Sequence, residues 1–421
     1  MTTEAYIQYI WKHRLFSVKS LRTTCGQELE ILNPGEQNTH AGPDFFNARI
    51  RLGTLVWAGN VEVHLFASQW NIHGHHQDPA YDNVILHVVH QSDLQIKNSK
   101  GRSIPSLIIN PLSVPASHQE NPDISENWLH CHPHIGDISA KALNPWFRQL
   151  YHERLNQKVH YINHIIHRFQ GDREKALLVA LASGFGLPIN KLPFEMLASG
   201  VPLSLLKEIK DCLPNVEALL FGQSGLLHAN SNQGSYASSL KQRYAHLKKA
   251  VVSNPLPPHL WKFLRIRPAS FPTLRLSQFA SLIHKHFPLY ENFMSSPTIL
   301  ELEPKLHLAS SSYWNTHYIF GKSSPDLIKK MGKQSTQHLC INVLIPFMVA
   351  IHRHEDIEIL YKLSAESNHL IKKWSNFGII PGNALESQAL IQLYNAYCKQ
   401  ERCLDCQIGA EIVKTAIHEK K

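Results

Sequence analysis

Hydrophobic and polar positions follow two different periods along this chain. Residues 4–16 place apolar side chains at helical spacing, so they predict an amphipathic helix. Short runs of alternating or β-branched residues come next, as expected for β-strands. The turn pair Gly53-Thr54 separates two of these runs, which predicts a β-hairpin or meander. The predicted strands cover residues 29–32, 47–52, 55–57, 61–66, 83–90 and 106–109.

From Asn144 onward, the apolar positions repeat at helical spacing. Pro145 suits the first turn of a helix that continues to Phe169. Proline-rich breaks at 254–258 and 267–272 divide the later helical segments. These segments cover residues 174–183, 202–209, 238–250, 276–286, 342–352, 357–364 and 384–397.

The two patterns divide the chain into two domains and a linker. Residues 1–115 form a predicted mixed α/β domain. Residues 110–140 contain four prolines and little periodicity, which is typical of a linker or long surface loop, and the predicted linker covers 116–140. Residues 141–421 form a larger all-α domain that ends in a cysteine cluster. The predicted fold class is therefore α+β.

Size, composition and charge narrow the class of protein. The 421 residues exceed what one core usually organises, and 43% hydrophobic with 18% charged residues is typical of a globular protein. The net charge of +9 favours an anionic partner such as nucleic acid. We find no signal-peptide pattern, and the longest apolar run, Ile341–Ile351, is too short to span a bilayer. We expect a cytoplasmic protein with no membrane partner, and the sequence leaves the oligomeric state open.

Two acidic positions and one histidine are the first candidates for chemistry. Asp44 follows a Gly-Pro pair just before one predicted strand, and Glu62 and His64 lie two residues apart on a later one. Positions two apart on a strand share a face, so Glu62 and His64 are expected to point the same way. Carboxylate oxygens suit Mg²⁺ or Mn²⁺, and an imidazole adds a ligand or a base. The alternatives are an ordinary Gly-Pro-Asp turn and a solvated strand face.

The order of these residues resembles the PD-(D/E)XK nuclease superfamily. Pro43-Asp44 matches the Pro-Asp half of that motif, and Glu62-Val63 matches the acidic part of the second half. His64 stands where the family has Lys, so it lacks a permanent positive charge. The resemblance implies an αβββαβ core, a divalent metal held by Asp44, Glu62 and His64, and phosphodiester hydrolysis.

A histidine-rich segment follows, and it contains His73, His75, His76 and Asp78. In a PD-(D/E)XK-like core this segment is the helix after the Glu-x-His strand, which puts His75, Asp78 and Tyr81 on one helical face. These side chains would contact phosphate or position water. The segment is also similar to the His-x-His-x-Asp-His metal site of metallo-β-lactamase-type hydrolases, although its spacing differs. A third interpretation is a polar surface turn.

Three cysteines near the C-terminus form the last candidate site. Cys398, Cys403 and Cys406 lie close together, as expected for ligands of zinc or of an iron–sulfur cluster. The sequence does not identify a fourth ligand; Cys25, Cys131, Cys340 and His338 are all candidates. The alternative is a set of reduced structural cysteines.

Nearly the whole chain resembles an uncharacterised conserved bacterial family, a domain of unknown function. This resemblance implies a single conserved architecture and an intracellular bacterial setting, and it implies no activity. It rests on NTHAGPDFFNARI at 38–50, WAGNVEVH at 57–64, HGHHQDPAYDNVILHVV at 73–89, RPASFPTLRLSQ at 267–278 and YCKQERCLDCQIG at 397–409.

These observations lead to one functional prediction and two alternatives. We expect a metal-dependent nuclease, or a nuclease-like protein that binds DNA or RNA. A local basic patch of Lys262, Arg265, Arg267 and Arg275 would contact the phosphate backbone. The first alternative is a non-catalytic interaction scaffold with a degenerate site. The second is a different metallohydrolase built around the His73–Asp78 segment.

Overall fold

The computed structural model divides into two compact units. The first unit comprises Met1–Asp123 with the short segment Lys262–Arg265, and the second comprises Ile124–Trp261 with Ile266–Lys421. Most of the predicted linker at 116–140 lies outside the described residues. The structure describes residues 3–14, 16, 21–38, 41–109, 129, 131, 140–227, 234–295, 298–351, 358–400 and 402–409.

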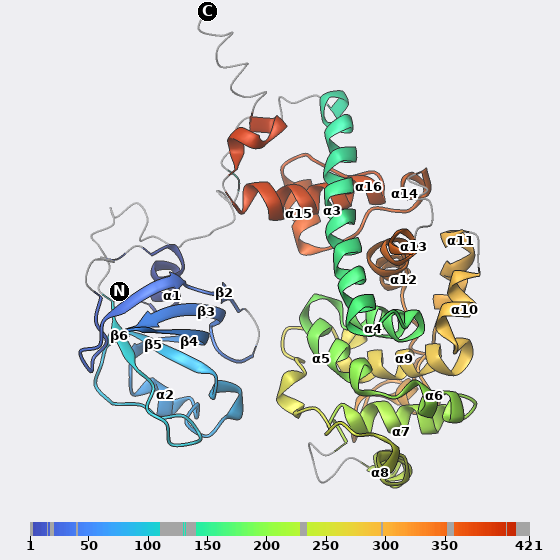
Figure 1. Ribbon diagram of the computed structural model, residues 1–421, viewed down its shortest axis with the longest axis horizontal. Helices are drawn as coiled ribbons and strands as arrows, with labels where there is room; N and C mark the ends of the chain where they lie inside the picture. The colour runs from blue at the N-terminus through green and yellow to red at the C-terminus, as the bar shows by residue number, and fades with distance from the viewer. Residues whose placement is uncertain are drawn as a thin grey trace, which may run out of the picture. The chain divides into compact units, whose positions relative to one another are not determined.

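A mixed β-sheet forms the centre of the first unit (Figure 1). Its strand order is β1-β3-β4-β5-β6, and β2 pairs with β3. The pairs β1–β3 and β3–β4 are antiparallel, whereas β4–β5 and β5–β6 are parallel. The elements are α1 (Glu4–His13), β1 (Leu29–Asn33), β2 (Glu36–Gln37), β3 (Phe45–Leu52), β4 (Leu55–Phe66), α2 (Gln69–Ile72), the 3₁₀ turn η1 (Pro79–Tyr81), β5 (Val84–Gln91) and β6 (Ser106–Ile108).

The strands of this sheet alternate their side chains between two cores. Val61 and Val63 of β4 pack with Ile7 and Trp11 of α1 in the larger core. The intervening side chains of β4 point to the other face, where Trp70 of α2 belongs to a smaller core. Glu62 and His64 are therefore placed on one face of β4, as the two-residue spacing predicts.

The first unit confirms the predicted opening helix, the β-hairpin and the strands on either side of the histidine-rich segment. The predicted breaks within β4 are absent, because 55–57 and 61–66 belong to one strand. The predicted helix that would align His75, Asp78 and Tyr81 is wrong. The helix α2 ends at Ile72, and Gly74 then takes a left-handed conformation with φ +76°.

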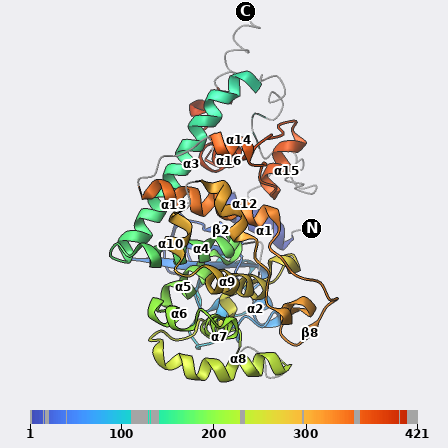
Figure 2. The same cartoon turned by 90° about the vertical axis from the view of Figure 1, so that its right-hand side faces the viewer.

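Helices make up most of the second unit, and the long helix α3 lies against α16, α13 and α4 (Figures 1 and 2). A small antiparallel pair of β7 and β8 is the sheet described in this unit. The first α-helices of this unit along the chain are α3 (Ala140–Arg168), α4 (Arg173–Phe185), α5 (Leu187–Gly200), α6 (Leu203–Ile209), α7 (Leu213–Gln223), α8 (Gly234–Leu247), α9 (Pro272–His286) and α10 (Leu289–Met294).

The elements after α10 include two π-helical turns, at Cys340–Leu344 and Tyr394–Cys398. The others are α11 (Ile299–Leu302), β7 (His317–Ile319), β8 (Lys322–Ser323), α12 (Lys333–Leu339), α13 (Ile345–Ala350), α14 (Glu358–Lys362), α15 (His369–Asn376) and α16 (Ala384–Leu393). The prediction of a larger helical region is thus confirmed, but α3 begins five residues before Pro145 rather than at it.

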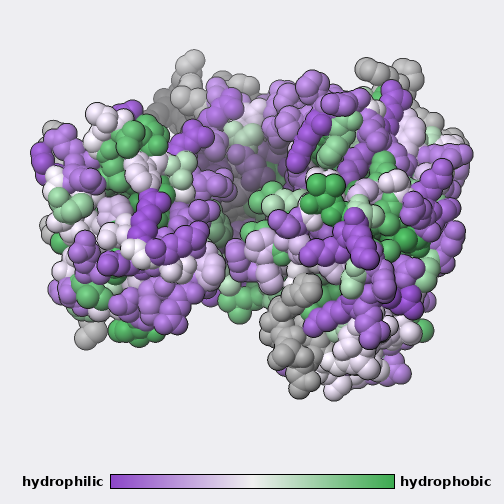
Figure 3. Space-filling model, turned by 60° about the horizontal axis from the view of Figure 1, so that its bottom comes forward, coloured by the Kyte–Doolittle hydropathy of each residue, from purple (hydrophilic) through white to green (hydrophobic). Residues whose placement is uncertain are grey.

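The face of the molecule in Figure 3 is mostly hydrophilic, with hydrophobic side chains in several separate places. Among the described residues, no helix combines the length and the apolar character that crossing a membrane requires.

Candidate metal centre

Asp44 and Glu62 come from neighbouring strands, and backbone hydrogen bonds tie them together. Asp44 stands directly before β3, and Phe45 at the start of β3 pairs with Val61 of β4. The Asp44 N–H donates to Glu62 Oε2 at 2.9 Å, and the Val63 N–H donates to Asp44 Oδ2 at 3.0 Å. These reciprocal bonds hold the two carboxylates side by side where β3 begins.

Burial and repulsion disfavour the charged form of both carboxylates. Burial raises the pKa of Glu62 to about 8, although the hydrogen bond from Asp44 lowers it. Burial, followed by the charge of Glu62, raises the pKa of Asp44 to about 7. In the part of the chain that the structure describes, the recorded ion-pair partners of Glu62 are His64 and His75. A bound cation would stabilise the charged form of such a buried pair.

His64 is buried at the centre of an imidazole cluster whose member His73 is exposed. Its Nε2 atom is 3.6 Å from Glu62 Oε1 and 3.1 Å from His73 Nδ1. Its Nδ1 atom is 2.8 Å from Nε2 of His87, a residue of β5. Burial, followed by the neighbouring imidazoles, lowers the pKa of His64 to about 2. His64 is therefore neutral near pH 7, and a neutral imidazole has a nitrogen lone pair for a metal ion.

His75 reaches the same cluster from the turn that follows α2. Its Nε2 atom is 3.3 Å from Glu62 Oε1. Its ring stacks on Tyr81 with 3.8 Å between the ring centroids, and the Trp70 ring meets both at a steep angle. Burial raises the pKa of Tyr81, so the phenol keeps its proton and can donate a hydrogen bond. The stacked rings of His75 and Tyr81 therefore lie on one side of Glu62.

Asp78 has a different position from the other predicted site residues. It is exposed, and its side chain accepts a hydrogen bond from the Ala80 N–H at 2.8 Å, which caps η1. Its charge raises the pKa of His75, while burial lowers it. The structure therefore places Asp78 at the margin of the cluster, where it acts on His75 through its charge.

The cluster offers a compact mixture of nitrogen and oxygen ligands. One ligand atom from each of His64, His73 and His75 lies within 4.8 Å of the other two. Glu62 Oε1 adds a carboxylate oxygen at 3.6 and 3.3 Å from His64 and His75. Imidazoles with a carboxylate suit Mn²⁺, Fe²⁺ or Zn²⁺ better than Mg²⁺. The predicted ligands Asp44, Glu62 and His64 are thus close together, and the structure adds two histidines.

A third carboxylate, Glu4, comes from the first turn of α1. Burial raises its pKa, whereas the charges of His73 and His75 lower it. A hydrogen bond with the Gln8 side chain lowers the pKa of Asp44, so the same helix also contacts the strand carboxylate. The sequence contains one signal for this face: Glu4 and Gln8 are four positions apart, a spacing that puts both on one side of a helix.

The family model described as a protein of unknown function (DUF2851) matches residues 4–376. The chain belongs to the DUF2851 family. The matched range contains the whole cluster from Glu4 to His87, and it ends before Cys398. No match was found among curated proteins or among solved structures.

In this member of the DUF2851 family, Lys262 brings a positive charge into the first unit. The segment Lys262–Arg265 belongs to that unit. A Cβ atom added to Gly42 would stand 3.3 Å from Lys262 Nζ, so the ammonium lies beside the loop that leads to Asp44. Burial lowers the pKa of Lys262, and the charge of Asp78 raises it.

The predicted basic patch of four cations is wrong for one of its members. Arg275 is buried within α9, and it donates hydrogen bonds to Gln278 at 3.1 Å and to Ser335 at 2.7 Å. Lys262 and Arg265 belong to the first unit, whereas Arg267 belongs to the second. Because its guanidinium is buried, Arg275 does not contribute to an exposed cationic surface.

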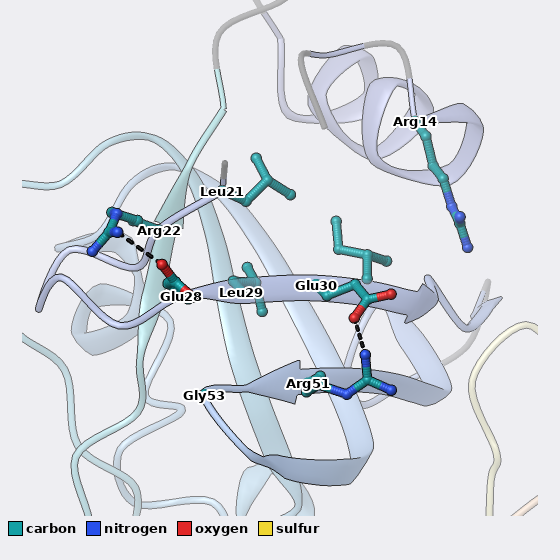
Figure 4. A pocket seen from close by; sticks show the side chains of 9 residues that line it. Arg14, Leu21, Arg22, Glu28, Leu29, Glu30, Arg51 and Gly53 are labelled. Atoms are coloured by element: carbon teal, nitrogen blue, oxygen red, sulfur yellow. Dashed lines mark hydrogen bonds and ion pairs between the residues drawn. The ribbon is translucent and has the colours of Figure 1, made fainter. Parts of the chain in front are cut away.

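A pocket of about 690 Å³ lies elsewhere in the first unit of the DUF2851 chain, beside β1 and β3 (Figure 4). Its charged lining side chains are largely matched, because Arg22 pairs with Glu28 and Arg51 pairs with Glu30. Arg14 donates to the Leu32 carbonyl oxygen at 3.1 Å. The lining includes none of the cluster residues, so this pocket and the candidate metal centre are separate features.

Proposed function

We propose that this protein is a divalent-metal-dependent nuclease with its metal centre at Asp44 and Glu62. One observation carries the proposal. Two carboxylates, one before β3 and one in β4, are fixed side by side by reciprocal backbone hydrogen bonds next to three imidazoles. Buried carboxylates with raised pKa values need a positive charge to stay ionised, and a divalent cation supplies it.

The topology of the first unit supports this proposal. The helix α1, the antiparallel strands β1, β3 and β4, the short helix α2 and the parallel strand β5 come in this order along the chain, with the two-residue strand β2 between β1 and β3. This is the order that a PD-(D/E)XK-like core requires, and Asp44 and Glu62 occupy the two acidic positions of that motif. Lys262 adds a nearby cation, although the motif position next to Glu62 is filled by His64.

The chain's own residues have distinct roles in this proposal. Asp44 and Glu62 provide oxygen ligands, and His64 remains neutral and provides nitrogen. A divalent metal held by these residues would act as a Lewis acid and would activate water for attack on a phosphodiester. His75 lies beside Glu62 as a proton acceptor, and the Tyr81 phenol donates a hydrogen bond to phosphate. The basic net charge of +9 favours binding of the polyanionic substrate.

Cleavage of labelled nucleic acids tests the proposal. Single- and double-stranded DNA and RNA are incubated with the wild type, Asp44→Asn and Glu62→Gln in Mn²⁺ or Mg²⁺. We expect cleavage by the wild type and a loss of at least ~100-fold in each variant, because each change removes a ligand charge and keeps the side-chain shape. Glu36→Gln makes the same change on the exposed strand β2 and should retain full activity.

Two results would contradict the nuclease proposal. One is a folded, metal-loaded wild type that cuts none of the substrates. The other is cleavage that survives in Asp44→Asn and Glu62→Gln. Binding of nucleic acid without cleavage would instead favour the scaffold alternative.

The three-histidine group supports a second candidate, a zinc-dependent hydrolase. His64, His73 and His75 form a set of ligand atoms of the kind that zinc prefers. This candidate predicts dependence on Zn²⁺, loss of activity in His73→Ala and little effect of Asp44→Asn. The nuclease proposal predicts the opposite order, with Asp44→Asn the more damaging change.

A further inference from the structure

Four cysteines from two distant parts of the chain line one small pocket in the second unit. Cys131 lies before α3, whereas Cys398, Cys403 and Cys406 follow α16. More than half of the chain separates Cys131 from the other three. The remaining lining residues are Leu129, Tyr397, Arg402 and Gly409.

The packing of α3 on α16 brings these segments together. The Trp146 ring of α3 meets the Tyr397 ring at 5.8 Å between centroids, and the Tyr397 hydroxyl donates to Glu153 of α3 at 3.0 Å. Cys398 ends the π-helical turn Tyr394–Cys398 that continues α16. Turns of this type are rare and occur often at functional sites. The position of Cys398 is therefore fixed by the helix pair.

The loop around Cys406 is shaped for a sulfur ligand. The backbone N–H groups of Ile408 and Gly409 form hydrogen bonds with the Cys406 thiol and lower its pKa, while burial raises it. A Cβ atom on Gly409 would stand 2.0 Å from the Cys403 carbonyl oxygen, so only glycine fits this close approach. Backbone N–H donors to sulfur are a usual feature of metal–thiolate sites.

The four thiols also interact electrostatically. The charges of Cys406 and Cys403 raise the pKa of Cys131, after burial as the larger cause. The charges of Cys131, Cys406 and Cys403 do the same for Cys398. Four thiolates that line one small pocket would repel one another, and a bound metal ion would remove that repulsion.

The other candidates for a fourth ligand have different surroundings. Cys25 belongs to the first unit, where its sulfur is 3.1 Å from the Thr23 hydroxyl. Cys340 is buried at the start of a π-helical turn after α12. His338 pairs with Glu366, its Nδ1 atom 3.3 Å from Oε1. None of these three residues lines the cysteine pocket.

We propose that Cys131, Cys398, Cys403 and Cys406 together bind a thiophilic metal centre, either a zinc ion or an iron–sulfur cluster. Four thiolates suit both occupants, so the ligand chemistry is shared. The centre joins the segment before α3 to the segment after α16, and so closes a long loop of chain. The proposal is independent of the nuclease proposal, because the two sites share no residue.

Metal and sulfide analysis of anaerobically purified full-length protein tests this proposal. We expect either one zinc per chain, or iron with acid-labile sulfide and visible charge-transfer absorption. Each of Cys131→Ser, Cys398→Ser, Cys403→Ser and Cys406→Ser should lose at least ~10-fold in bound metal. Cys212→Ser, at a cysteine outside the pocket, should keep all of it.

Cobalt substitution keeps the test valid if the serine variants fail to fold. Co²⁺ added to metal-stripped wild type should give sulfur-to-metal charge-transfer bands with the intensity of four thiolates. Wild type that contains neither zinc nor iron and gives no such bands would overturn the proposal. Full metal retention in a folded Cys131→Ser variant would overturn it as well.

Discussion

The carboxyl groups of Asp44 and Glu62 hold their protons far more tightly than exposed acids do. Their pKa values of about 7 and about 8 arise first from burial, and the charge of the neighbouring Glu62 raises the pKa of Asp44 further. Proton binding and metal binding therefore compete for the same oxygens. Near pH 7 the metal-free site retains protons that a metal ion must displace.

The pH dependence of stability follows from these raised pKa values. Without metal, the folded state binds more protons than the unfolded state between about pH 4.5 and about pH 8. The contribution of the protonated carboxyl groups to the unfolding free energy is complete below that window, and it is lost as the pH rises through it. We expect Glu62→Gln to raise the unfolding free energy of the metal-free protein at about pH 8 by roughly 1–2 kcal/mol. Denaturant unfolding in a chelating buffer measures this change.

The same competition predicts how metal affects stability. Mn²⁺ should raise the melting temperature of the wild type more at about pH 8.5 than at about pH 6, because protons leave the ligands as the pH rises. Glu62→Gln should show little metal effect at either pH, and Glu36→Gln should behave like the wild type. A metal effect that is larger at the lower pH would contradict these ligand assignments.

Some site residues are visible in the sequence and others are not. Glu62 and His64 could be paired from their spacing, because a strand places positions two apart on one face. The resemblance to the PD-(D/E)XK nuclease superfamily added Asp44 to this pair. Glu4 and His87 could not be joined to it, since they reach the cluster only when α1 and β5 pack against the sheet.

At the scale of elements, the parallel contact between β4 and β5 sets the positions of Glu62 and His64. Gly59 lies in β4 where β5 comes closest to it. A Cβ atom there would stand 2.4 Å from Ile85 Cγ2 and 2.6 Å from the Asn83 carbonyl oxygen. The sheet therefore has no room for a side chain at this position.

Gly59→Ala should force β5 away from β4. We expect the unfolding free energy to fall by about 1–3 kcal/mol, the usual range for an overpacked site. Gly382→Ala is the control, because a Cβ atom there has its nearest neighbour, Glu386 Oε2, at 3.7 Å and its backbone is not left-handed. Equal stability of the two variants in denaturant unfolding would show that β4 and β5 are not this close.

Local pattern identifies elements well where one face is exposed, whereas buried helices differ: α4 is predicted although Lys175–Phe185 are all buried, and α7 is not. The alternating strands of the hairpin and the amphipathic helix α1 follow their predicted periods. In the helix α7, Val216–Gln223 are all buried and show no periodic contrast. The helix α5 was not predicted because it contains Pro193.

At the scale of the whole molecule, each unit has its own interior. Among the described residues, the two cores around the sheet are built from residues 6–109. The boundary at Asp123 leaves these cores intact. A unit with complete cores is expected to fold without the rest of the chain.

A fragment of residues 1–123 should therefore fold by itself. We expect cooperative thermal unfolding with a β-rich circular dichroism spectrum, and stabilisation by Mn²⁺ that Asp44→Asn removes. The fragment lacks Lys262, so its cleavage activity should be below that of the full chain. An unfolded fragment would mean that the second unit is required for the sheet to form.

The position of a bound metal tests the central claim most directly. Anomalous diffraction from crystals grown with Mn²⁺ locates the ion without any assumption about the substrate. We predict a peak within bonding distance of the Asp44 and Glu62 carboxylates and of a His64 nitrogen. A peak held by His64, His73 and His75 without Asp44 would favour the zinc hydrolase instead. No peak in this cluster, at saturating Mn²⁺ and about pH 8.5, would contradict the proposed metal centre.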